Sequence, residues 1–151
     1  GVQKSAEAEL AELKVTMKDT QPVGALVECC RTLDQAKAVL TFCEAIMEKT
    51  LRSTVVLTAA RGRGKSAALG LAMAGAVAAG YSNIFVTAPS PENLKTLFEM
   101  VVKGFDALEY KEHQDYELVQ STNPEFNKAI VRINIFHAHR QTIQVRRLLR
   151  C

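Results

Sequence analysis

The chain has 151 residues, of which 48% are apolar, 23% are charged and 6% are aromatic, a composition that excludes disordered and fibrous proteins and fits one globular domain. The 19 basic and 16 acidic side chains leave a net charge of +3, which is too small to indicate a nucleic-acid partner by itself. The longest uncharged interval, Ser66–Pro91, has a continuous apolar part too short for a bilayer of about 30 Å, so we expect a soluble protein with no membrane partner.

The first third of the chain is predicted to be mainly helical. Apolar residues recur at helical spacing within Ser5–Lys18, which predicts a surface helix. Val23–Val27 is short and apolar, and is compatible with either a buried strand or a turn. Thr32 and Gln35 form a capping-box pattern, and the apolar residues that follow predict a helix ending near Lys49.

The middle of the chain is predicted to alternate strands and helices. Ser53–Thr58 is β-branched and apolar, as is typical of a strand buried on both faces. A glycine-rich turn then leads into a predicted helix over Lys65–Ala79, and Ile84–Thr87 forms the next short apolar strand. Ser90 at the N-cap and Pro91 at the first helical position open a further helix.

The last third is predicted to contain short strands, at Tyr116–Val119, Lys128–Phe136 and Gln141–Val145. The order strand, turn, helix, strand, helix in the middle of the chain is typical of a parallel α/β sheet. We therefore predict an α/β fold with a parallel sheet and flanking helices.

The strongest motif is the run Ala59–Ser66, which has the features of a phosphate-binding loop. Such a loop needs glycines where a Cβ would obstruct the backbone amides, and a helix N-terminus that adds partial positive charge. It also needs a lysine for the β- and γ-phosphates of ATP and a hydroxyl for Mg²⁺; Lys65 and Ser66 fill these two positions. The nucleotide-binding residues that we predict are Arg61, Gly62, Arg63, Gly64, Lys65, Ser66 and Ala67.

The loop departs from the common phosphate-loop pattern at one position, where Ala59 replaces the first glycine. The form A-x-x-G-x-G-K-[ST] resembles motif I of superfamily-two helicases. The alternative is a basic glycine-rich turn without a ligand. The buried-type strand before the loop and the helix after it favour the nucleotide site, and a P-loop NTPase with a RecA-like sheet.

Two further positions resemble helicase motifs, and each has a purely structural alternative. Gln35 resembles the upstream glutamine that reads adenine in such cores, and it is equally the capping-box residue. Thr87 and Ser90, in the run Thr-Ala-Pro-Ser, are similar to motif Ia, which contacts the nucleic-acid backbone. A serine N-cap before a proline is equally a plain helix start.

Over nearly its whole length, from about Ser5 to Gln144, the chain closely resembles the RNA cytidine acetyltransferases, and most closely the eukaryotic nucleolar member. The segments that carry the resemblance are Thr50–Thr54, Leu57–Leu71, Gly80–Leu94, Phe105–Leu108, Asn123–Lys128 and His139–Gln144. The resemblance implies a nuclear, nucleolar parent protein that makes N4-acetylcytidine in 18S ribosomal RNA and in tRNA. Its implied cofactors are ATP and Mg²⁺ in a helicase-like module and acetyl-CoA in a separate domain. Its implied partners are pre-rRNA and tRNA, and the resemblance is compatible with a homo-oligomer.

The resemblance stops after Gln144, where the family continues toward a strand ending in Asp-Glu, and no acidic residue of this chain follows Glu125. We therefore divide the chain into a helical N-terminal segment (residues 1–50), a partial P-loop ATPase core truncated before the Walker B strand (51–144) and a non-family tail (145–151). We interpret the chain as a truncated product or gene-model fragment. We assign no catalytic residue, and expect the chain alone to bind nucleotide at most. The alternatives are a fragment of a superfamily-two RNA helicase or translocase, and an inert nucleotide-binding fragment.

Overall fold

The computed structural model describes residues 5–48, 64–81, 83–86, 91–124, 130–136 and 142–145. The helices and strands in these ranges are α1 (Ala6–Met17), α2 (Val23–Glu28), α3 (Leu33–Met47), α4 (Lys65–Ala78), β1 (Asn83–Val86), α5 (Pro91–Ala107), β2 (Tyr116–Gln120), β3 (Ile130–Ile135) and β4 (Thr142–Val145). None of the helices in these ranges is both long and apolar enough to cross a membrane.

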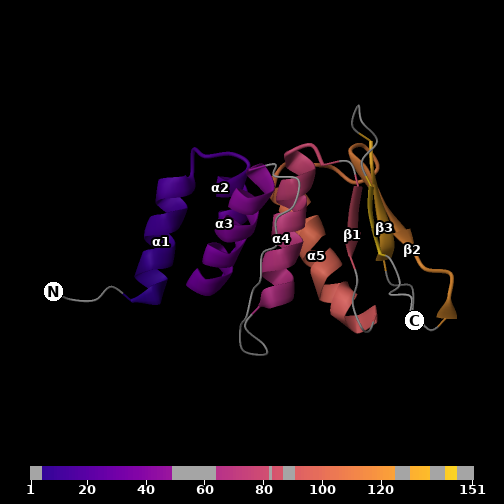
Figure 1. Cartoon of the computed structure of the whole chain (residues 1–151), viewed down its shortest axis with the longest axis horizontal. Helices are drawn as coiled ribbons and strands as arrows, with labels where there is room; N and C mark the ends of the chain where they lie inside the picture. The colour runs from indigo at the N-terminus through magenta and orange to yellow at the C-terminus, as the bar shows by residue number, and fades with distance from the viewer. Residues whose placement is uncertain are drawn as a thin grey trace.

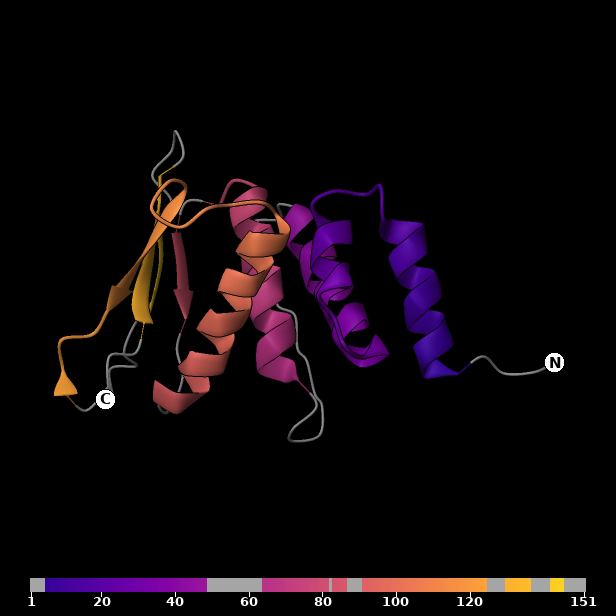
Figure 2. The same ribbon diagram turned by 180° about the vertical axis from the view of Figure 1, so that it is seen from behind.

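The elements are arranged in successive layers along the long axis of the molecule. Figures 1 and 2, which view the chain from opposite sides, both place α4 and α5 between the sheet and the N-terminal helices α1, α2 and α3. One hydrophobic core runs through these layers, from Leu10 on α1 to Ile133 and Ile135 on β3. The N-terminal helices therefore share a single core with the sheet and the helices that cover it.

The sheet is mixed, with the strand order β1-β4-β3-β2. β1 pairs in parallel with β4, whereas β4 with β3 and β3 with β2 are antiparallel pairs. The predicted parallel sheet is therefore wrong for the second half of the described chain. The reason is connectivity: β2, β3 and β4 follow one another through short connections, which only antiparallel neighbours allow, while α5 lies in the long path from β1 back to β4.

Most of the predicted elements are confirmed within the described ranges, including the N-terminal helix and the strands at β1, β2, β3 and β4. The apolar side chains of α5 form its inner side, since Leu94, Leu97, Phe98, Val101 and Phe105 are all buried. The prediction of a strand or turn at Val23–Val27 is wrong, because this segment lies in helix α2. The predicted strand at Ser53–Thr58 lies outside the described residues.

Helix α4 occupies the centre of the molecule and packs against both α3 and α5. All of its residues from Gly70 to Val77 are buried, and most of them are alanine or glycine. A Cβ on Gly70 would come within 2.5 Å of the Leu97 carbonyl oxygen and 2.8 Å of the Met100 Cβ, both on α5. Small residues thus let α4 approach its neighbours closely, and they fix where its N-terminus lies.

Candidate nucleotide-binding site

The N-terminus of α4 is built differently from those of α1 and α3. In α1 the hydroxyl of Ser5 accepts a hydrogen bond from the Ala8 amide, and in α3 the hydroxyl of Thr32 accepts one from the Gln35 amide. The N-cap of α4 is Gly64, which has no side chain to form such a bond, and the first turn of α4 has no acidic residue. The first amides of α4 therefore keep the donors and partial positive charge that attract an anion.

Gly64 adopts a left-handed conformation, with φ of 78° and ψ of 28°. An L-residue at this position would be strained, whereas glycine adopts it without cost. A left-handed residue before the first helical residue turns successive backbone amides toward one side, which is the geometry of anion-binding nests. The helix then continues normally, since the Ala68 amide donates to the Gly64 carbonyl at 3.0 Å.

The residues after Gly64 divide into a solvent-facing part and an anchored part. Lys65 is exposed and Ser66 is half-buried, so both are accessible from the solvent side. Ala67 and Ala68 are buried, and they hold the first turn of α4 against the core. The other predicted site residues, Arg61, Gly62, Arg63, Thr87 and Ser90, lie outside the described residues.

The structure brings Gln35 directly against the last glycine of the loop. A Cβ on Gly64 would collide with the Gln35 amide nitrogen, and would lie 2.9 Å from Cδ and 3.1 Å from Cγ of that side chain. Gln35 also forms the predicted cap. Its backbone amide donates to the Thr32 hydroxyl (3.2 Å), and its side-chain Oε1 accepts from the backbone amide of Arg31 (2.9 Å). The side chain therefore has its oxygen engaged in the cap and its nitrogen beside the loop.

Three contacts show how α3 and α4 are aligned. Gln35 and Gly64 lie at the first turns of the two helices, and the Cys43 sulfur lies close to Gly75 farther along. At the other end the Tyr81 hydroxyl donates to the Ile46 carbonyl oxygen at 2.5 Å. Both helices thus run in the same direction, so their N-termini, where the helix dipoles are positive, lie at the same end.

Sequence patterns could not have revealed two features of this site. The contact between Gln35 and Gly64 joins distant parts of the chain, and no local spacing encodes it. Arg31 belongs to no predicted motif, yet its backbone amide donates the hydrogen bond that holds the side-chain oxygen of Gln35. In the described part of the chain, no group of three or more His, Cys, Asp or Glu side chains is placed to hold a metal ion.

Comparison with known proteins finds relatives that match most of the chain. The sequence profile of the family described as "RNA cytidine acetyltransferase NAT10/TcmA, helicase domain" matches residues 56–148. Proteins named RNA cytidine acetyltransferase from Mus musculus and Homo sapiens are 76% and 75% identical over 139 residues, which is 92% of this chain. The protein of the same name from Saccharomyces cerevisiae is 65% identical over 138 residues. The chain spans about 14% of the length of the mouse and human relatives and 13% of the yeast one.

Proposed function

Because the chain belongs to the RNA cytidine acetyltransferase family, we propose that it is part of the family's helicase-like ATPase module and binds Mg–ATP at the N-terminus of α4. The observation that carries this proposal is the left-handed, uncapped Gly64 at the start of a helix without acidic residues in its first turn. This arrangement suits a phosphate group and offers little to a neutral ligand.

In this proposal each residue of the loop has a distinct task. The backbone amides from Arg61 to Ala67 surround the phosphates, and the Lys65 ammonium reaches the β- and γ-phosphates. The Ser66 hydroxyl holds Mg²⁺, which neutralises charge on the phosphate oxygens when it is bound. Gln35 lies beside the loop, where its amide nitrogen is the group we propose for reading the adenine base.

We propose the RecA-like P-loop fold on the same grounds, with Ser53–Thr58 as the strand that leads into the loop. The parallel pairing of β1 with β4 supports this fold, because RecA-like domains are built around parallel strands. Thr87 and Ser90 follow β1 in sequence, and we propose that they contact the RNA backbone.

The remaining functions belong to a longer protein, since the chain spans only about 14% of the mouse and human relatives. We propose that the whole protein uses acetyl-CoA to make N4-acetylcytidine in 18S ribosomal RNA and in tRNA, that it acts in the nucleolus, and that pre-rRNA and tRNA are its partners. The names of the relatives favour this function over a superfamily-two RNA helicase or translocase.

Calorimetric titration of Mg–ATP into the 151-residue chain tests the nucleotide-binding proposal. We expect saturable binding that Lys65→Ala weakens by at least about tenfold, because a charge-assisted contact to phosphate is lost. Lys95→Ala is the matched control, since Lys95 is also an exposed helical lysine and is not in the loop. Equal affinities for the wild type and Lys65→Ala would contradict the proposal.

A further inference from the structure

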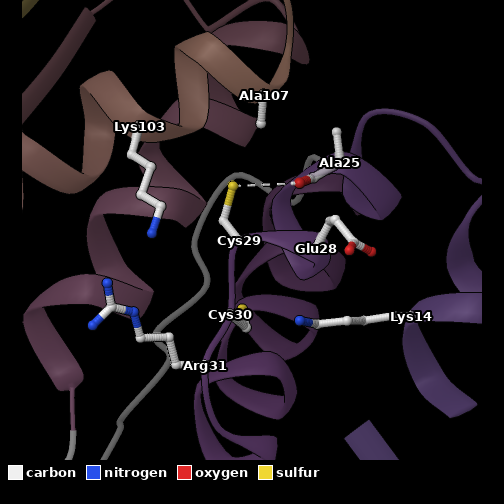
Figure 3. A pocket seen from close by; sticks show the side chains of 8 residues that line it. All are labelled: Lys14, Ala25, Glu28, Cys29, Cys30, Arg31, Lys103 and Ala107. Atoms are coloured by element: carbon white, nitrogen blue, oxygen red, sulfur yellow. Dashed lines mark hydrogen bonds between the residues drawn. The ribbon is translucent and has the colours of Figure 1, made fainter. Parts of the chain in front are cut away.

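A second site lies on the side of the molecule where the N-terminal helices meet α5. It is a surface pocket with a volume of about 600 Å³, bounded by α1, α2, the turn after α2, and α5 (Figure 3). The residues that line it are Lys14, Ala25, Glu28, Cys29, Cys30, Arg31, Lys103 and Ala107. Among the described residues, Gln35, Gly64, Lys65 and Ser66 are not part of this lining.

Three basic side chains from three different elements line the pocket. In Figure 3 the Lys103 ammonium and the Arg31 guanidinium point toward one another across the opening, and Lys14 enters from α1. Lys14 and Lys103 are half-buried and Arg31 is exposed. Within the described ranges, no salt bridge within 4.0 Å joins any of these three cations to a carboxylate.

The acidic groups near the pocket do not cancel this charge. Glu28 is the one carboxylate in the lining, so three cations and one anion leave the lining with a charge of +2. Asp106, which is exposed, also acts on Cys29 from the α5 side. Like charges held facing one another are unfavourable, and a bound anion between them removes that repulsion.

We propose that this pocket binds the phosphate group of a nucleotide-sized ligand, taken either as a free nucleotide or as one unit of an RNA strand. A planar guanidinium facing an ammonium suits phosphate, because arginine donates two parallel hydrogen bonds and lysine supplies a compact charge. The volume lies within the roughly 300–1,000 Å³ that is usual for small-molecule sites. The small side chains of Ala25 and Ala107 leave room beside the cations for a sugar.

The described lining of the pocket differs from the residues at the N-terminus of α4. The backbone amide of Arg31 donates to Gln35, and Gln35 in turn lies against Gly64. Gln35 in the first turn of α3 therefore links Arg31 to Gly64, and Arg31 contributes its side chain to the pocket and its backbone amide to Gln35. The proposal does not depend on ATP binding by the loop, and it holds or fails independently.

Cys29 provides a local probe of the pocket. Its thiol is half-buried in the lining and donates a weak hydrogen bond to the Ala25 carbonyl at 3.6 Å. Burial raises the pKa of Cys29, and the nearby Lys103 opposes that rise. Alkylation of Cys29 by iodoacetamide, followed by peptide mass spectrometry, therefore reports on access to the pocket, while alkylation of the buried Cys43 reports on unfolding.

The test measures protection of Cys29 by AMP and by a short single-stranded RNA, in a chain that carries Lys65→Ala so that the loop does not compete. We expect saturable protection of Cys29 without a change at Cys43. In the double variant Arg31→Gln/Lys103→Gln, the ligand concentration that gives half-protection should rise at least about tenfold. Lys95→Gln, on the same helix as Lys103 but outside the lining, should leave it unchanged.

The comparison is made within each variant, with and without ligand, because loss of Lys103 itself changes the reactivity of Cys29. Protection by RNA at lower concentration than by AMP identifies a strand as the source of the phosphate, and equal protection identifies a free nucleotide. The proposal is overturned if neither probe protects Cys29 up to about 10 mM, which corresponds to binding too weak to be specific, or if the double variant is protected as well as its parent. Should the double variant expose Cys43, Lys103→Gln alone replaces it and must raise the half-protection concentration.

Discussion

Gly64 is subject to two separate constraints, and they can be measured apart. Its φ of 78° disfavours any residue with a Cβ, and the Gln35 side chain fills the space that a Cβ would take. Gly80 has a similarly positive φ of 96°, but nothing lies within 4 Å of a Cβ there. The two glycines thus share the backbone constraint, and only Gly64 adds the contact.

We predict that Gly64→Ala lowers the free energy of unfolding by about 2–3 kcal/mol, because backbone strain costs ~1–2 kcal/mol and displacement of Gln35 from its cap costs ~1 kcal/mol. Gly80→Ala should cost ~1–2 kcal/mol from strain alone. Urea unfolding measures both. In a Gln35→Ala background the cost of Gly64→Ala should fall to that of Gly80→Ala, and an unchanged cost would contradict the contact.

Gln35 has a capping role that the structure shows and an adenine-reading role that we propose, and Gln35→Glu separates them. A glutamate at this position still accepts the Arg31 amide, so unfolding free energy should change by less than ~0.5 kcal/mol. It has no amide nitrogen beside Gly64, and its added charge repels both ligands alike, so affinity for Mg–ATP should fall about tenfold more than affinity for inorganic triphosphate does. Equal losses for both ligands, measured by calorimetry, would assign Gln35 to the cap alone.

Among the single elements, sequence patterns predicted the helices that have a cap or a helical spacing of apolar residues. The prediction was wrong for Val23–Val27, which has neither. The cap formed by Thr32 and Gln35 is local, and it predicted the start of α3 correctly. Val23–Val27 is a short apolar run, and such runs do not distinguish a helix from a strand by periodicity. Helix α2 forms there after a tight turn, and a Cβ on its second residue, Gly24, would collide with the Met17 carbonyl oxygen.

The closeness of α4 and α5 leads to a prediction for Gly70. Alanine normally stabilises a helix by about 0.5–1 kcal/mol relative to glycine. At Gly70 the added Cβ would meet the Leu97 carbonyl, which is backbone and cannot rotate away, so overpacking of about 1–3 kcal/mol should outweigh that gain. Thermal unfolding should show a lower melting temperature for Gly70→Ala.

A matched control for this change lies one position earlier on the same helix. Leu69 is 38% exposed, so Leu69→Ala should change the stability by less than Gly70→Ala does. If Gly70→Ala raises the melting temperature, α4 and α5 are not as close in solution as they are here.

At the scale of the whole molecule, sequence patterns predicted the α/β class but not the sheet. The pairing of β4 with both β1 and β3 joins segments that no local pattern relates. The same holds for the parallel alignment of α3 and α4, which brings Gln35 to Gly64. Motif spacing selects candidate loop residues because a phosphate loop is a local structure, whereas the contact of Gly64 with Gln35 depends on packing.

The buried thiols predict how the stability of the whole chain depends on pH. Burial raises the pKa of Cys30 to about 12 and that of Cys43 to about 11, from the ordinary value of 9.0. The folded state therefore favours the neutral thiols. Their contribution to stability is complete below pH 9 and is lost as the pH rises from about 9 through about 11 to 12.

Urea unfolding at a series of pH values from 8 to about 11 measures this dependence. We expect the wild type to lose stability over this window more steeply than the double variant Cys30→Ala/Cys43→Ala, which is less stable throughout because it has lost buried side chains. Tyr110 and Tyr116, whose pKa values burial also raises, are present in both chains and cancel in the comparison. Parallel profiles would show that the pKa values of the two thiols do not differ between the folded and unfolded states.

The N-terminus of α4 is, in our proposal, the part of the chain that binds the phosphates of Mg–ATP. The most direct measurement is a titration of the ¹⁵N-labelled chain with Mg–ATP, followed through the backbone amide signals of Gly64, Lys65, Ser66 and Ala67. We expect these amides and the Gln35 side-chain amide to shift together with one saturation curve, and Lys65→Ala to move the curve to higher concentration. A well-folded chain whose Gly64–Ala67 signals do not move at saturating nucleotide would contradict it.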